Sequence, residues 1–181
     1  DITNRVYIEN GTTVTVTADA NCKSLIFTGT SQNLNINSGA TLNVTNEVTL
    51  LAYVNNTLYT IHTTANIGGL GTLNASSLNV GVLLNVGSFI NGTDFTTLSL
   101  SLPTVNIAGN ITLYNNDNGG GNANDPVLHV LSPCNLSASK IAIIGTGGGN
   151  GYAREMRFDV ASGAQVNLSG GPNPISIDVS V

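Results

Sequence analysis

Charged side chains are scarce in this chain, and their scarcity excludes several kinds of partner. Asp, Glu, Lys and Arg make up 8% of the 181 residues, whereas ordinary soluble domains carry about a quarter. The five cations are too few to form a stripe that follows a phosphate backbone, so we expect no nucleic-acid partner. The formal net charge of −5 comes from scattered acidic residues rather than from an acidic tail.

Long apolar runs are also missing. No stretch approaches the roughly 18 apolar residues that a membrane-spanning helix requires, so we expect no membrane insertion. No charged segment followed by an apolar one opens the chain, and we therefore expect Asp1 to begin a mature or trimmed protein. Scarce charge, few lysines and abundant Asn and Thr favour an extracellular location.

Only two cysteines are present, Cys22 and Cys134. Each could serve as a small buried apolar side chain, or the pair could form the disulfide of an oxidising compartment. In a regular stack of repeats the two residues lie near opposite ends, too far apart for a bond within one molecule. A disulfide from Cys134 of one subunit to Cys22 of the next is the remaining hypothesis.

What the chain does contain is a phrase that recurs at an almost constant interval. A turn or small residue precedes an apolar–polar–apolar alternation. The first apolar residues of successive copies are 28, 31, 32, 31 and 30 positions apart, at Val14, Leu42, Leu73, Val105, Leu136 and Val166. A fixed period is typical of repeat proteins, and alternation of period two indicates strands. We therefore predict one all-β domain over residues 1–181, a β-solenoid (parallel β-helix) of about six coils with a period of ~30 residues.

A second short strand follows each copy of the phrase, over residues 24–27, 48–50, 78–80, 111–113, 141–143 and 175–179. The alternation places Val and Leu inside and Thr and Asn outside. Two Gly/Asn-rich loops, 115–126 and 145–151, follow at a similar offset and are expected on one side of the stack. The alternative fold, a β-sandwich, also has many short strands, but it does not predict a period of this kind.

Neither end of the predicted solenoid has a polar or helical cap, so unpaired backbone groups face outward. Open edges that match favour head-to-tail assembly of copies through added β-pairing. We predict a non-enzymatic subunit of a surface filament or adhesin stalk, and the alternative is a piece cut from a longer solenoid. The predicted edge residues are Val6, Tyr7, Ile8, Val14, Val16, Ile175, Ile177, Val179 and Val181.

Residues 37–44 (NSGATLNV) and 14–26 (VTVTADANCKSLI) resemble repeats of large secreted bacterial surface proteins with β-helical adhesin stalks. The likeness covers roughly the first 50 residues well and the rest loosely. Such repeats report architecture more than ligand. The resemblance implies export, surface display, and adhesion or assembly, and it assigns no catalytic residue.

One Gly-rich loop concentrates oxygen ligands of the kind that Ca²⁺ requires. Its spacing matches no EF-hand or nonapeptide calcium repeat, so a solvated turn is the alternative, and we expect no other cofactor. The candidate calcium ligands are Asp117, Asn118, Asn122, Asn124 and Asp125.

Outward polar residues suggest two further kinds of site. Asn-x-Ser/Thr sequons, which are N-glycosylation acceptors in secreted proteins, begin at Asn10, Asn43, Asn55, Asn74, Asn91, Asn110, Asn135 and Asn167. A flat Thr/Asn face that binds ice or a crystalline polysaccharide, including surface glycans, is the second hypothesis, with a plain solvated sheet as its alternative. That face comprises Thr13, Thr15, Thr41, Asn43, Thr72, Asn74, Thr104, Asn106 and Asn167.

A β-helical polysaccharide-degrading enzyme is the contrasting functional class. Glu155, Arg157 and Asp159 share one face of an expected strand. Residues four apart on a strand are about 13 Å apart, too far for either glycosidase geometry unless another coil supplies a partner. We therefore interpret the cluster as a surface ion ladder, and we interpret His62 and His129 as structural.

Overall fold

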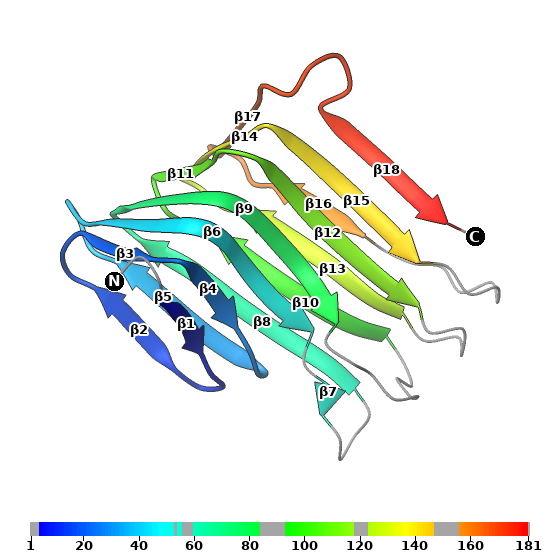
Figure 1. Ribbon diagram of the computed structural model, residues 1–181, viewed down its shortest axis with the longest axis horizontal. Coiled ribbons are helices and arrows are strands. Elements are labelled where there is room, and N and C mark those ends of the chain that lie inside the picture. Colours follow the sequence, from blue (N-terminus) through cyan, green and yellow to red (C-terminus); the bar gives the residue numbers. More distant parts are fainter. Residues whose placement is uncertain are drawn as a thin grey trace.

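The computed structural model describes residues 4–52, 54–55, 60–83, 93–117, 123–146 and 156–180. These residues form a parallel β-solenoid, with no helix in the described ranges. The strands stack from the N-terminal end of the molecule to the C-terminal end, so the two termini lie at opposite ends (Figure 1). The prediction of an all-β solenoid is confirmed. Nowhere in these ranges is there a helix long and apolar enough to cross a membrane.

Each coil contributes strands to three parallel sheets, which we call faces A, B and C. Face A pairs, in order, β2 (Thr13–Val16), β5 (Ser31–Ile36), β8 (Thr60–Gly69), β10 (Thr93–Leu100), β13 (Ala123–Val130) and β16 (Arg157–Val160). Face B pairs β3 (Ala20–Cys22), the first halves of β6 (Thr41–Ala52) and β9 (Thr72–Leu83), β11 (Thr104–Ile107), β14 (Asn135–Ala138) and β17 (Gln165–Leu168).

Face C completes the coil. It pairs β1 (Arg5–Ile8), β4 (Ser24–Phe27), the second halves of β6 and β9, β12 (Asn110–Asp117), β15 (Lys140–Thr146) and β18 (Ile175–Ser180). The short β7 (Val54–Asn55) pairs antiparallel with the start of β8. Strands β6 and β9 turn the corner between faces B and C without a break, and a register shift between Val44 and Glu47 marks the bend in β6.

The register places the repeated phrase in one column, as predicted, from its second copy onward. Leu42 is paired with Leu73, and the column continues through Val105, Leu136 and Val166 on face B. The second predicted strands also stack, in a column on face C that runs through Leu25, Val48, Leu78, Ile111, Ile141 and Ile175.

Two expectations about the coil are wrong. Val14 does not belong to the face B column: it is paired with Leu34 on face A, and Ala20 takes the place above Leu42. Each coil also has three strands, whereas the sequence pattern predicted two. The strands that the pattern did not reveal are those of face A. Its inward column is Val14, Leu34, Ile67, Leu100, Val130 and Val160.

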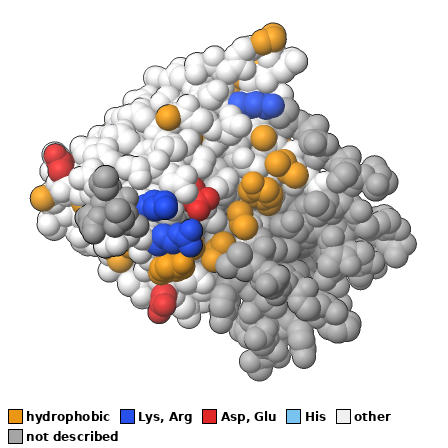
Figure 2. Space-filling view, viewed as in Figure 1, with side chains coloured by type: hydrophobic (Ala, Val, Ile, Leu, Met, Phe, Trp, Pro, Cys, Tyr) orange, Lys and Arg blue, Asp and Glu red, His pale blue; other side chains and the backbone are white. Residues whose placement is uncertain are grey.

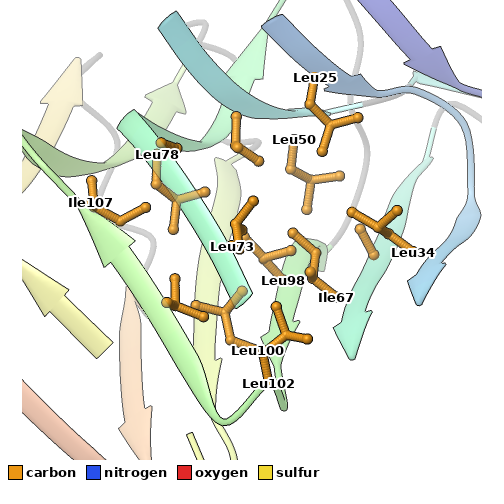
Figure 3. Packing of buried hydrophobic residues seen from close by; sticks show 14 of the residues in the cluster. Leu25, Leu34, Leu50, Ile67, Leu73, Leu78, Leu98, Leu100, Leu102 and Ile107 are labelled. Carbon is orange, nitrogen blue, oxygen red and sulfur yellow. The ribbon is translucent and has the colours of Figure 1, made fainter. Parts of the chain in front are cut away.

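The space between the three faces is filled by apolar side chains. Leu50, Leu73 and Leu98 come from faces C, B and A, and none of them is exposed. Figure 3 shows side chains of all three faces pointing toward one another between the strands. Burial of this apolar area is the main favourable term in folding, and no coil buries its inner surface without a neighbour.

Successive coils differ mainly at the corner between faces C and A. The two predicted loops leave β12 and β15 at matching positions, since Asn115 is paired with Gly145 and Asn116 with Thr146. Residues 115–117, 123–126 and 145–146 of the predicted loops are thus in strands β12, β13 and β15, and residues 118–122 and 147–151 lie outside the described residues. In the first full coil a tight turn at Gly29 replaces the loop, and the step from Ala20 to Leu42 is accordingly only 22 residues.

Candidate functional site

A ladder of asparagine side chains runs along the outside of face B. Asn43 Nδ2 donates to Asn21 Oδ1 at 3.1 Å, and Asn74 Nδ2 donates to Asn43 Oδ1 at 2.8 Å. Asn106 Nδ2 donates to Asn74 Oδ1 at 2.9 Å, and Ser137 Oγ donates to Asn106 Oδ1 at 2.9 Å. All four bonds point the same way, so each amide polarises the next and is held in one rotamer.

Beside this ladder lies an open groove that follows the stack across four coils. The ladder residues Asn43, Asn74, Asn106 and Ser137 form one wall, and Thr45, Ser76 and Ala108 form the other. Between the walls the buried residues Val44, Ala75 and Ile107 form the floor. The hollow arises where the chain bends from face B to face C, because the side chains at the bend are small.

The groove is electrically neutral. None of the described residues that line it is charged, and Figure 2 shows few charged side chains on the side in view. In each interior amide one N–H and one oxygen lone pair are used by the ladder. A carboxamide has two of each, so Asn43, Asn74 and Asn106 each retain one donor and one acceptor for a ligand or for water.

The predicted Thr/Asn face is confirmed in part. Thr41, Thr72 and Thr104 form one outward column on face B, beside the asparagine column that continues to Asn167. Thr13 and Thr15 lie on face A instead. The sequence pattern did not identify Asn21 and Ser137 as part of this face. Asn21 lies in a three-residue strand without the usual turn phrase, and the signal that could have identified it is its position between two apolar residues.

The residues of the inward columns are buried in the middle of the stack and more exposed at its two ends. On face C, Val6 is 37% exposed and Ile175 is 56% exposed, whereas every residue between them in the column is at most 2% exposed. On face A, Val160 is 45% exposed and Val14 is half-buried. On face B, Ala20 and Val166 are half-buried.

The predicted edge residues lie at these two ends. Val6, Tyr7 and Ile8 are in β1 and Val14 and Val16 in β2, although Ile8 is fully buried. Ile175, Ile177 and Val179 are in β18, while Val181 lies outside the described residues. Within the described residues, β1, β2 and β3 have a neighbour on one side only, as do β16, β17 and β18.

Both cysteines are buried and free. Burial raises the pKa of Cys22, and it raises the pKa of Cys134 to about 11. Cys134 is 0% exposed and Cys22 is 3% exposed, so neither sulfur is accessible to a second copy. Burial of both thiols argues against a disulfide between subunits, and that hypothesis stays a prediction.

The predicted calcium loop is only partly covered by the structure. Asn118 and Asn122 lie outside the described residues. Asp117 ends β12 and pairs antiparallel with Ala123, so the strands that flank the loop form a hairpin. Asp125 is 5% exposed and lies in β13. In the described ranges no three acidic, His or Cys side chains converge as metal ligands would, and calcium binding stays a prediction.

The sequons fall into different environments. Asn43 and Asn74 are committed to the ladder, and Asn10 Oδ1 accepts hydrogen bonds from the Thr30 N–H at 3.1 Å and hydroxyl at 2.6 Å. Three others are exposed: Asn110, Asn135 and Asn167. The backbone of Asn55 lies in β7, and Asn91 is outside the described residues. Glycosylation stays a prediction.

A small ionic cluster lies on face A near the C-terminal end. Arg157 Nη2 donates to Asp159 Oδ2 at 2.8 Å, and His129 Nε2 lies 3.1 Å from the same oxygen. The register pairs His129 directly with Asp159, a contact that sequence reasoning missed because it treated His129 alone. Glu155 lies outside the described residues, and His62 is paired with Phe95 through its backbone in β8.

Comparison of the chain with protein-family models, with curated proteins and with solved structures finds no match.

Proposed function

We propose that this protein is a non-enzymatic structural rod of about six coils, ~30 Å long at ~4.8 Å per coil, whose copies stack head to tail. The observation that carries the proposal is the burial gradient along the three inward columns. At one end of the stack the columns begin with Val6, Val14 and Ala20. At the other end they finish with Ile175, Val160 and Val166. All six side chains are apolar, and a second copy covers them.

Backbone pairing supports the same contact. Among the described residues the terminal strands have one free edge each, and each end of the stack presents three strands, one from each face. When one end docks on the other, each sheet gains a neighbouring strand. The backbone N–H and C=O groups at the free edges then form hydrogen bonds. Such a contact joins two different surfaces, does not close on itself, and so produces a filament.

Outside the cell is the location we propose for this rod, as part of a surface fibre or adhesin stalk. The low content of charge and the resemblance of residues 14–26 and 37–44 to adhesin-stalk repeats support it. Detection of the chain by antibody on intact producing cells is the test, and detection only after lysis would contradict it.

Stacking is tested by blocking one edge. The Asn33 N–H donates to the Thr12 carbonyl and the Asn37 N–H to the Val16 carbonyl, each at 2.9 Å. Since backbone groups alternate along a strand, those of Thr15 point to the free edge. Thr15→Pro removes that outward N–H, leaves the bonds to β5 in place, and is expected to weaken stacking at least about tenfold.

Sedimentation velocity over a concentration series, with negative-stain microscopy of the same samples, measures the effect. Thr15→Val is the matched control, because it changes the same exposed side chain but keeps the N–H, and it should stack as the parent does. Thr15→Pro blocks one end only, so mixing it with the parent should shorten the filaments. A parent protein that stays monomeric at all concentrations would overturn the proposal and favour ends covered by further coils of a longer chain.

A further inference from the structure

We propose that the groove on face B binds an extended, uncharged polysaccharide strand that lies lengthwise along the stack. The proposal is independent of head-to-tail assembly, because all of the lining residues come from four neighbouring coils within one molecule.

The spacing of the polar groups favours this ligand over a peptide. Equivalent groups of Asn43, Asn74 and Asn106 recur once per coil, about every 4.8 Å, which is comparable to the advance of one sugar unit in an extended polysaccharide. Side chains on one face of an extended peptide recur only about every 6.8 Å. A peptide strand would therefore lose register with the ladder within two or three coils.

The charge of the groove selects against acidic polymers. It offers amides and hydroxyls but no cation, and the chain as a whole carries a net charge of −5. A polymer with a carboxylate or sulfate on every unit would lose hydration without gaining a partner. A neutral sugar chain presents hydroxyls, which are both donors and acceptors and match the free donor and acceptor of each ladder amide.

The ladder also holds the amide side chains of the groove in place before a ligand binds. Each interior amide is fixed by a bond on either side, as Asn74 is between Asn43 and Asn106. Little side-chain entropy is then lost when a ligand binds. No aromatic ring is among the described residues that line the groove, so binding depends on the number of coils engaged, and we expect retention to increase with polymer length.

Affinity electrophoresis of the full chain through gels containing soluble mixed-linkage β-glucan tests the proposal, with alginate as the charged extended polymer. The parent protein should be retarded by β-glucan and not by alginate. Asn74→Leu removes two ladder bonds and the free amide groups at the centre of the groove. It should weaken retardation by roughly five- to tenfold or more.

Asn66→Leu is the matched control. Asn66 Nδ2 donates to Asn33 Oδ1 at 3.1 Å on face A, so the variant breaks the same kind of bond but leaves the groove intact, and retardation should not change. Thermal melting verifies that both variants are folded. If Asn74→Leu does not fold, Ser76→Arg is tested in its place. This variant should also weaken retardation by β-glucan, because it places a bulky cation in the groove wall at an exposed position.

Three results would overturn the proposal: no retardation of the parent protein by β-glucan, equal retardation by alginate, or equal losses in Asn74→Leu and Asn66→Leu. Thermal hysteresis without retention on β-glucan would overturn it in favour of an ice-binding face. Sedimentation of the same samples reports stacking separately, so failure of one proposal is distinguishable from failure of the other.

Discussion

At the scale of single residues, the most unusual side chain is Gln32. It is fully buried, and neither its amide nitrogen nor its amide oxygen has a hydrogen-bond partner. Its place in the register, opposite Ala65, puts it on the inward side of β5 with Leu34 and Ile36. An unpaired buried amide costs about 1–3 kcal/mol of stability. The core therefore carries a polar group that its neighbours do not satisfy.

Replacing Gln32 with methionine should stabilise the protein. Gln32→Met keeps the length of the side chain and removes the unpaired amide, and we expect the free energy of unfolding to rise by about 1–2 kcal/mol. Urea unfolding measures the change. Gln165→Met is the matched control, because Gln165 is exposed in β17 and the same exchange there should change little. A fall in stability for Gln32→Met would contradict this account.

The buried cysteines predict a loss of stability in alkali. Cys134 keeps its proton in the folded state up to about pH 11, whereas an unfolded thiol releases it near its ordinary pKa of 9.0. The contribution of the buried Cys134 thiol to the free energy of unfolding is therefore fully present below pH 9, and it decreases as the pH rises from 9 toward 11. Unfolding by urea at several pH values measures the decrease, and Cys134→Ala should show a smaller one. An identical pH dependence in both proteins would contradict the assignment.

At the scale of elements, the corner between faces A and B decides how closely coils can approach. Gly69 ends β8 with φ +113°, and a Cβ there would collide with the Ile36 backbone of the previous coil. Only glycine combines that backbone conformation with that approach. Gly39, in the corresponding corner one coil earlier, has φ +78° but open space around it.

The two glycines separate backbone strain from coil-to-coil packing. Gly69→Ala should lower the free energy of unfolding by about 3 kcal/mol or more, because strain and collision both act. Gly39→Ala should cost about 1–2 kcal/mol, because strain acts alone. Urea unfolding of both variants provides the comparison. Equal losses would show that coil spacing at this corner is not set by Gly69.

At the scale of the whole molecule, the apolar columns of faces A and C run from coil to coil along the described stack, and their first and last residues are the more exposed ones. The columns that begin at Val6 and Val14 and end at Ile175 and Val160 keep the same chemistry throughout. A further coil of any copy would therefore meet an apolar surface that matches its own. The outer surface differs, because one face carries a neutral groove and another carries the cluster of His129, Arg157 and Asp159.

The spacing of Leu42, Leu73, Val105, Leu136 and Val166 was enough to predict a solenoid and one of its columns, because alternation and period are properties of the chain itself. The same logic failed for Val14 and for face A. The strands of face A follow loops of variable length, and the missing loop after β4 shortens the first full coil to 22 residues.

What the sequence alone determined is therefore the strand alternation and the repeat. What only the tertiary structure decided is which polar groups meet. Asn43, Asn74 and Asn106 are about thirty residues apart in the chain and become hydrogen-bonded neighbours only because their coils lie in register. The groove has the same origin, since a hollow at the bend between two faces depends on how the sheets meet and not on any local pattern.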